Sequence, residues 1–260
     1  MKKCSKKKAW FVPTAEQNLN LILKVATVNV ATAVKKKPRN NLLKTALFGA
    51  VFVLRGWLMK KGKIISMAVL AGVFAVVAYL GFSGVIAEFE AWLPHFLNPK
   101  SEIGELFYSF TVLGDTIPDV IIIAALVLLP VTCKKVGIPV AVTAISSTVI
   151  NKIVKNLIAR PRPLEKLLEV SSFSFPSGHA MNNTAIYLMI FFCILPYCKS
   201  KLQKVICFVV LMIFPLMMGI SRIYFNVHYF SDVVCGWCLG AIIAIVFSEI
   251  FKKVIENARN

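Results

Sequence analysis

The chain has 260 residues, of which 58% are hydrophobic and only 16% are charged, and its mean hydropathy is +0.74. These values exclude an ordinary soluble domain, in which about a quarter of the residues are charged. The chain is also far longer than one membrane span, which takes roughly 20 residues as a helix. The composition therefore predicts an all-α, polytopic membrane protein.

The formal charge of +18 is concentrated near the N-terminus. Half of the 30 Lys and Arg residues lie within residues 1–63, which contain one acid, Glu16. A basic arm beside a membrane follows from the positive-inside rule and from attraction to anionic headgroups. No aromatic-basic interleaving or nucleic-acid motif accompanies the charge, so nucleic-acid binding is not expected. We predict that residues 1–63 form a basic N-terminal extension at the cytoplasmic face, in contact with anionic lipids.

Six apolar runs follow the extension, each long enough or nearly long enough to cross a hydrocarbon core of about 30 Å as a helix. No composition break divides them, so residues 64–251 are expected to form one six-helix membrane domain, with 252–260 as a short cytoplasmic tail. The predicted spans are 64–86, 117–133, 137–157, 179–198, 205–221 and 230–251.

Lysines flank alternate connections between the spans, which predicts the orientation of the chain. They are Lys134, Lys135, Lys199, Lys201, Lys204, Lys252 and Lys253. The positive-inside rule then places both termini in the cytoplasm of a cell-membrane protein. The connections 87–116, 158–178 and 222–229 fall on the outer side. We expect most of the acids in and near these connections, such as Glu90 and Asp115, to lie on a solvated surface.

Seven cysteines are present, and six of them lie in or at the ends of apolar segments. Cys in such positions behaves as a small hydrophobic residue, so no disulfide framework is expected. The pattern CGWC at 235–238 lies in a predicted membrane helix without a thioredoxin-like strand before it, which favours packing over redox chemistry.

The segment SRIYFNVHYFSD at 221–232 contains a histidine and an aspartate four residues apart. If the last helix begins near residue 228, His228 and Asp232 lie on one face of it. The carboxylate can then fix the imidazole tautomer and leave the other ring nitrogen free to attack. The alternative is a helix-capping Asp beside a histidine at the membrane interface.

The segment FPSGH at 175–179 precedes an apolar run. Pro176 and Gly178 bend the chain, and the start of the following helix presents free N–H groups suited to an anion. Ser177 adds a hydroxyl, and His179 is an imidazole that can protonate a leaving oxygen. The alternative is a simple turn at the start of a helix.

The segment KNLIARPRP at 155–163 adds cations at the end of the third predicted span. Lys155 and Arg162, together with Arg222 from a different segment, suit the charge that develops on a phosphoryl group during transfer. Lys and Arg that extend from a membrane boundary toward water are the alternative for each residue alone. That alternative does not account for the two histidines.

The patterns K-x6-R-P, P-S-G-H and S-R-x5-H-x3-D, in this order, resemble the three signature motifs of the type 2 phosphatidic acid phosphatase (lipid phosphate phosphatase) superfamily. The resemblance covers about 64–251, and the Lys-rich, compact sequence favours a bacterial member. It implies a phosphatase without metal or cofactor in which His228 becomes phosphorylated, Asp232 orients it and His179 protonates the leaving group. It further implies a phosphate site of Lys155, Arg162, Ser177, the Gly178 amide and Arg222, whereas Arg160 lies outside the signature.

The leading hypothesis is a membrane-integral lipid phosphatase or diphosphatase that acts at the outer face. Candidate substrates are undecaprenyl diphosphate, phosphatidylglycerol phosphate and phosphatidic acid. Transfer of phosphate from lipid to another acceptor, or a non-catalytic lipid-phosphate-binding protein, are the alternatives. The vanadium haloperoxidases share the signature but are soluble, which disfavours them here. The patterns assign no oligomeric state and no role to Asn182 or Asn183.

Overall fold

The computed structural model describes residues 61–96 and 102–256. All of them lie in the second of two compact units, Leu58–Asn260. The predicted extension 1–63 falls almost entirely outside the described residues, as do residues 257–260 of the predicted tail 252–260. Those two boundaries therefore stay predictions.

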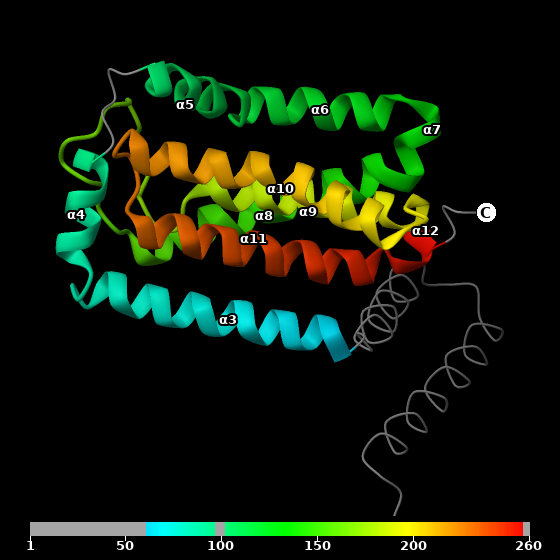
Figure 1. The fold of residues 1–260 in the computed structure, drawn as a ribbon, viewed down its shortest axis with the longest axis horizontal. Coiled ribbons are helices and arrows are strands. Elements are labelled where there is room, and N and C mark those ends of the chain that lie inside the picture. The colour runs from blue at the N-terminus through cyan, green and yellow to red at the C-terminus, as the bar shows by residue number, and fades with distance from the viewer. Residues whose placement is uncertain (1–60, 97–101, 257–260) are drawn as a thin grey trace, which may run out of the picture. The chain divides into compact units, whose positions relative to one another are not determined.

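Every regular element in the described residues is a helix (Figure 1). The elements in chain order are α3 (Lys61–Phe82), α4 (Ala87–Phe96), α5 (Glu102–Leu113), α6 (Thr116–Leu128), α7 (Pro130–Thr132), the π-helix η1 (Cys133–Gly137), α8 (Ile138–Ile158), α9 (Gly178–Ile194), the 3₁₀-helix η2 (Leu195–Tyr197), α10 (Lys201–Tyr224), α11 (Phe230–Ile250) and α12 (Lys252–Glu256).

Five helical stretches are long and apolar enough to cross a membrane. They correspond to α3, α7 through α8, α9 with η2, α10 and α11. The pair α5 and α6, bent by 49° between residues 113 and 116, passes the same test as one broken span. The predicted all-α membrane fold is therefore confirmed in the described residues, with five candidate spans, or six if the bent pair is one span.

The second span differs from its predicted bounds of 117–133. It is built from α5 and α6, whereas residues 130–137 form α7 and η1 and lead into α8. Hydropathy alone misses α5 because Glu102 and Glu105 lie in its first turns. Asp115 breaks the span, since its extended backbone and its side-chain bond to the Thr116 N–H cap a new helix.

Two predicted connections are also shorter than expected. The region 87–116 contains α4 and α5 instead of a long loop, and α10 continues to Tyr224. The turn before α11 is therefore only 225–229. As a result Arg222 lies in the last helical turn of α10, which fixes its backbone more firmly than a loop would.

Helix α11 lies at the centre of the described bundle and packs against α9, α3, α8 and α10 (Figure 1). Glycines allow the closest approach between α11 and α9: a Cβ added at Gly240 would lie 2.3 Å from the Met181 carbonyl oxygen. Met181 and Ala185 on α9 and Ile243 on α11 fill this contact as a buried cluster. Small residues at such crossings are typical of helix packing in membranes.

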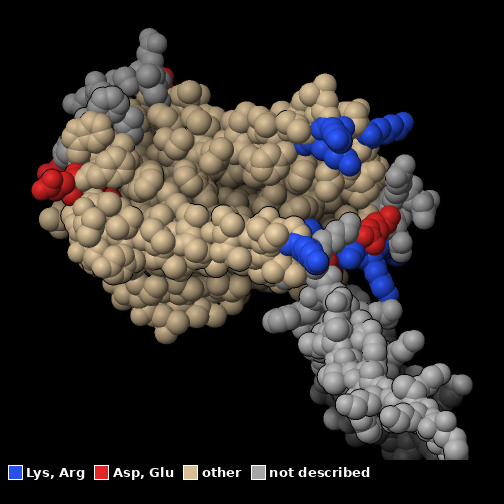
Figure 2. Space-filling view, turned by 60° about the horizontal axis from the view of Figure 1, so that its bottom comes forward, with Lys and Arg blue, Asp and Glu red and all other residues tan. Residues whose placement is uncertain are grey.

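The two ends of the bundle differ in charge. Lysines cluster where α3, α10 and α12 begin and in η1, and Figure 2 shows Lys and Arg gathered at one end of the face in view, with a largely uncharged middle. At this end Lys63 forms an ion pair with Glu249, with 2.6 Å between Nζ and Oε1. The segments singled out by their motifs lie at the opposite end of α8, α9, α10 and α11 (Figure 1).

The α9–α11 contact makes a prediction about stability. Gly240→Ala places a methyl group against the backbone of α9, so we expect it to lower the unfolding free energy in detergent by about 1–3 kcal/mol, as overpacking does. Gly72→Ala on α3 is the matched control, because a Cβ there meets nothing within 4 Å. Thermal unfolding monitored by circular dichroism measures both variants. Equal midpoints for Gly240→Ala and the control would contradict the close approach.

Candidate active site

Backbone hydrogen bonds join the three motif segments at one end of the bundle. The Ser177 N–H donates to the Asp232 carbonyl at 3.0 Å, and the Ser174 N–H donates to the Arg160 carbonyl at 2.9 Å. The structure thus brings residues from the 159–177 connection, the start of α9 and the start of α11 into one place.

His228 lies in the 225–229 turn and is 1% exposed. Its Nδ1 is 3.5 Å from Asp232 Oδ2 and 3.3 Å from Ser174 Oγ. The Ser174 hydroxyl also donates to Oδ2, and the Tyr229 N–H donates to the same oxygen at 3.0 Å. The predicted pairing of His228 with Asp232 is therefore shared with Ser174, which contacts both groups.

The other ring nitrogen of His228 faces a cation. Arg162 Nη1 lies 3.2 Å from Nε2 and donates to the Val227 carbonyl at 2.5 Å, while Arg162 Nε donates to the Ser172 carbonyl at 2.6 Å. This network assigns the proton to Nδ1, toward Asp232, and the lone pair to Nε2. Burial lowers the pKa of His228 to about 3, with Asp232 opposing the shift and Arg162 adding to it. The imidazole is thus neutral near pH 7.

Three cations, Lys155, Arg162 and Arg222, lie close enough for their charges to act on one another and form a cation cluster, of which Arg162 contacts Nε2. Lys155 is 8% exposed in the last turn of α8, and its ammonium donates to the Phe173 carbonyl. Arg222 is 3% exposed, and its Nε has no hydrogen-bond partner among the described residues. Buried cations are costly unless an anion or other acceptors satisfy them. The cluster therefore suits a bound anion.

The N-terminus of α9 adds neutral donors. Ser177 is its N-cap and is fully buried, and Gly178 is its first residue. Asn151 on α8 donates to the Pro176 carbonyl at 3.3 Å, and a Cβ added at Gly178 would lie 3.0 Å from the Asn151 amide oxygen. Glycine thus permits a close approach of α8 to a helix start that favours anions.

His179 pairs with a carboxylate that the motifs do not include. Its Nε2 lies 3.5 Å from Oδ1 of Asp115, the N-cap of α6. Asn183 holds the bend between α5 and α6 next to His179, since its Nδ2 donates to the Gly114 and His179 carbonyls, each at 3.0 Å. Asn182 accepts from the Ser147 hydroxyl at 2.6 Å. Both asparagines thus have structural partners.

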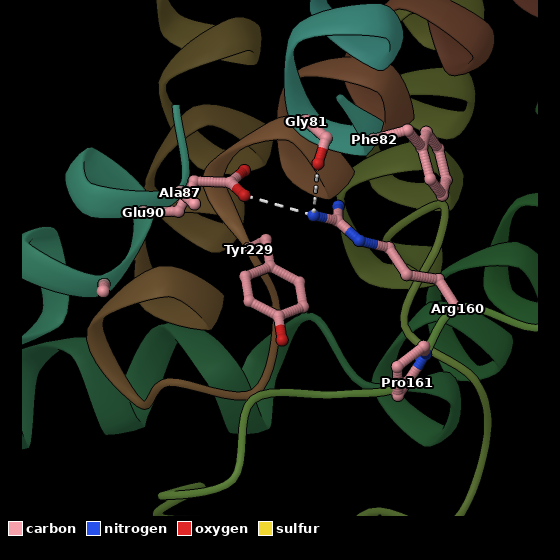
Figure 3. Close-up of a pocket in the computed structure, with 8 residues that line it drawn as sticks. Gly81, Phe82, Ala87, Glu90, Arg160, Pro161 and Tyr229 are labelled. Carbon is pink, nitrogen blue, oxygen red and sulfur yellow. Dashed lines mark hydrogen bonds and ion pairs between the residues drawn. The ribbon is translucent and has the colours of Figure 1, made fainter. Parts of the chain in front are cut away.

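Arg160 lies outside the cation cluster and pairs with two carboxylates, of which Figure 3 shows Glu90. Its Nη1 is 2.6 Å from Asp232 Oδ1 and 2.8 Å from Ser231 Oγ. Its Nη2 is 3.1 Å from Glu90 Oε2 and 3.2 Å from the Gly81 carbonyl oxygen. A cavity of about 310 Å³ borders this group, lined by Gly81, Phe82, Ala87, Glu90, Ala91, Arg160, Pro161 and Tyr229.

Three acids in and near the outer connections have specific surroundings, although the sequence predicts a solvated surface for most of this set. Glu90 is 6% exposed and paired with Arg160, and Asp115 contacts His179 although its side chain is 62% exposed. Asp119, in the same set, is buried. The sequence DTIP at 115–118 does carry a helix-start signal, an N-cap Asp with Pro in the first turn. No local pattern indicates the partner of Glu90.

The arrangement suits nucleophilic attack on an anionic centre. A neutral imidazole presents Nε2 to Arg162, a member of the cation cluster, and a second imidazole with its own carboxylate lies at the start of α9. Within the described ranges, no three His, Cys, Asp or Glu side chains are grouped so as to hold a metal ion. Cys235 and Cys238 are buried in α11 as free cysteines.

Comparisons with known proteins agree with this geometry. Residues 136–256 match the sequence profile described as the PAP2 superfamily. The chain is 34% identical over 108 residues to phosphatidylglycerophosphatase B of Bacillus subtilis and 27% identical over 137 residues to undecaprenyl-diphosphatase of Sulfolobus acidocaldarius. The two alignments cover 40% and 49% of this chain. They cover 53% and 61% of the two relatives, so this chain matches less than two thirds of the length of each.

A solved structure covers more of the chain. The crystal structure of a transmembrane PAP2-type phosphatidylglycerolphosphate phosphatase from Bacillus subtilis superposes with a TM-score of 0.62 at 26% identity. The superposition covers 72% of this chain and 96% of that one. The helical fold around the site is therefore shared with a membrane phosphatase.

The buried His228 makes a prediction about protonation. An ordinary histidine with a pKa near 6.5 is mostly protonated at pH 5, whereas a pKa lowered to about 3 keeps the ring neutral there. Histidine-selective ¹⁵N NMR in micelles should therefore show a signal from an imidazole that stays neutral from pH 8 down to pH 5. Its signal should disappear in His228→Gln, which assigns it. A midpoint between pH 6 and 7 for that signal would contradict the burial.

Proposed function

We propose, from the PAP2 superfamily domain that residues 136–256 form, that this chain is a membrane-integral lipid phosphatase with a histidine nucleophile. The observation that supports it most is the neutral, buried imidazole of His228, whose Nε2 faces the cation cluster 3.2 Å from Arg162. A neutral imidazole has the lone pair that attack requires, and the cations stabilise charge on the phosphoryl oxygens.

In the first step, the Nε2 lone pair of His228 attacks phosphorus while the bond from phosphorus to the lipid oxygen breaks. The bonding electrons leave with that oxygen, which takes a proton from His179. Lys155, Arg162 and Arg222, with the Ser177 hydroxyl and the Gly178 amide, hold the phosphoryl oxygens. Asp232 keeps the Nδ1 proton of His228 in place and stabilises the positive ring.

In the second step, water attacks the phosphohistidine. His179, now neutral, accepts the proton of the attacking water, and the phosphorus–nitrogen bond breaks with its electrons returning to Nε2. Inorganic phosphate leaves and both histidines regain their starting states. Protein cations supply the charge stabilisation in both steps, so the proposal requires no metal ion or cofactor.

A lipid phosphate is the proposed substrate class. The site lies at the ends of apolar helices, where a headgroup phosphate meets the protein while its tail stays among lipids. The names of the two relatives point to phosphatidylglycerol phosphate and undecaprenyl diphosphate as candidates, and phosphatidic acid belongs to the same class. The lysines at the opposite end of the bundle favour cytoplasmic termini and a site that faces outward.

The first test is phosphate release by purified protein across a panel of lipid phosphates and diphosphates, with EDTA present. We expect turnover of at least one substrate and a loss of about 10³-fold or more in kcat for His228→Ala, as for removal of other nucleophiles. The variant should keep the helical circular dichroism of the parent. Turnover by His228→Ala would rule out the nucleophile, and full loss in EDTA that Mg²⁺ restores would rule out the proposed charge stabilisation.

The second test concerns His179. A general acid matters most for a basic leaving group, so His179→Ala should slow an alkyl phosphate by about 10²-fold or more. An activated aryl phosphate, whose leaving group needs no proton, should lose much less. Initial rates on the two substrates under saturating conditions provide the comparison. Equal losses on both would show that His179 is not the acid.

A further inference from the structure

Arg160 is a partly buried cation that the phosphatase mechanism does not use. Its side chain is 11% exposed, and those of its two carboxylate partners, Glu90 and Asp232, are 3% and 0% exposed. The close-up shows the guanidinium group directed at Glu90 and the Gly81 carbonyl, beside the Tyr229 ring (Figure 3). The Tyr229 and Phe82 rings lie 4.1 and 5.1 Å from its central carbon.

These contacts hold one side of the Asp232 carboxylate. Oδ1 accepts from Arg160 at 2.6 Å, while Oδ2 is turned toward Ser174, the Tyr229 N–H and the His228 ring. A carboxylate fixed at one oxygen cannot rotate its other oxygen away from the imidazole without losing a buried, charge-assisted bond. Arg160 therefore constrains the group that orients His228.

Glu90 extends this constraint to a helix outside residues 136–256. Its Oε2 holds Arg160, and its Oε1 accepts from the Ser231 N–H at 2.8 Å and from the Ser231 hydroxyl at 2.5 Å. Ser231 and Asp232 both lie in the first turn of α11. Glu90, from α4, thus holds both the arginine and the helix turn that carries the aspartate.

We propose that Arg160 is a positioning residue that acts on His228 through Asp232, and that Glu90 of α4 holds Arg160 in place for this role. The inference rests on the proposed phosphatase function. It adds a positioning apparatus that comes from the ends of α3 and α4 as well as from the three motifs.

The competing role for Arg160 is a fourth cation of the phosphate site. The geometry disfavours it, because both Nη atoms are directed at protein acceptors. The charges disfavour it as well, since one cation between two carboxylates leaves a net negative group. A phosphate-binding role and a positioning role differ in what they change: the first weakens phosphate binding, and the second lowers kcat.

The experiment compares Arg160→Gln with Arg162→Gln on a lipid phosphate that the parent protein hydrolyses. For Arg160→Gln we expect kcat to fall by about 10–100-fold, in the range of lost supporting contacts, with the inhibition constant of inorganic phosphate within twofold of the parent. Arg162→Gln should weaken phosphate inhibition. The matched control is Lys166→Gln, which removes an exposed cation from the same connection. The ammonium of Lys166 donates to the Val170 carbonyl and contacts neither carboxylate of the Arg160 group.

A parental kcat for Arg160→Gln, or a normal kcat with weakened phosphate inhibition, would overturn the positioning role. Absence of phosphate release by the parent protein itself would instead count against the proposed function. The two failures are therefore distinguishable in the same assay.

Removal of a buried arginine leaves two carboxylates unpaired, which can prevent folding. The double variant Arg160→Gln/Glu90→Gln keeps the local net charge unchanged and separates the two effects. Because Glu90→Gln keeps an oxygen that can accept from Ser231, it removes mainly the charge that holds Arg160. The kcat loss of the double variant should therefore be no larger than that of Arg160→Gln alone, not the product of two single losses. A parental kcat in the folded double variant would overturn the proposal.

Chemical rescue supplies a second readout that a purely structural defect would not show. The cavity of about 310 Å³ beside Arg160 opens next to the guanidinium position. Guanidinium added to Arg160→Ala should raise kcat at least severalfold. Sodium chloride at equal ionic strength should not raise the kcat of Arg160→Ala, and guanidinium should not raise the kcat of Lys166→Gln. No recovery in a variant that keeps the parent's circular dichroism would contradict a positioning role for the cation.

Discussion

The site depends on burial of the Asp232 carboxylate, whose side chain has no exposed surface. A buried carboxylate is costly unless charge and hydrogen bonds compensate it. Its partners come from separate segments: Arg160 and Ser174 from the connection after α8, and the Tyr229 N–H from the turn before α11. The Asp232 carbonyl accepts from Ser177 at the start of α9. The bonds that satisfy this one residue therefore also bring the three motifs together.

The chemistry that we propose divides the charges by position in the bundle. Asp232 lies on the Nδ1 side of the His228 ring and Arg162, from the cation cluster, lies on the Nε2 side, so the proposed attack and charge stabilisation occur on the Nε2 side. For the lysines at the other end we propose a different task, the orientation of the chain in the membrane. The apolar helices between them carry few charges, which confines both functions to the helix ends.

Much of this arrangement is readable from the sequence, for physical reasons that differ by element. Long apolar runs bounded by lysine predict α3 and α11 well, because hydropathy over 20 residues is a strong signal. The pair His228 and Asp232 is readable because a spacing of four brings two side chains close at a helix start, although His228 lies in the turn before α11 and not on the helix itself. Arg160 was a cation outside the signature, and its ion pair with Asp232 depends on the path of the chain after Pro161, which no periodicity describes.

The features that the sequence does not predict share one cause, which is that they leave little local pattern. Glu90 and Asp115 resemble the solvated acids of any outer loop until their partners, about 70 residues away in sequence, are known. The break between α5 and α6 is hidden from a hydropathy average, since it comes from one capping aspartate. Contacts between distant residues and single-residue breaks leave little local pattern, whereas spans and short motifs leave a strong one.

The central claim is that the phosphoryl group is transferred to His228 as a covalent intermediate. The most direct measurement is to detect phosphohistidine at this residue. Protein mixed with a ³²P-labelled lipid phosphate is denatured in alkali, which preserves phosphate on histidine nitrogen, and the labelled peptide is sequenced. The account predicts label on the peptide that contains His228, with attachment at that residue. Label on another residue, or phosphate release with no labelled protein at any quench time, would contradict it.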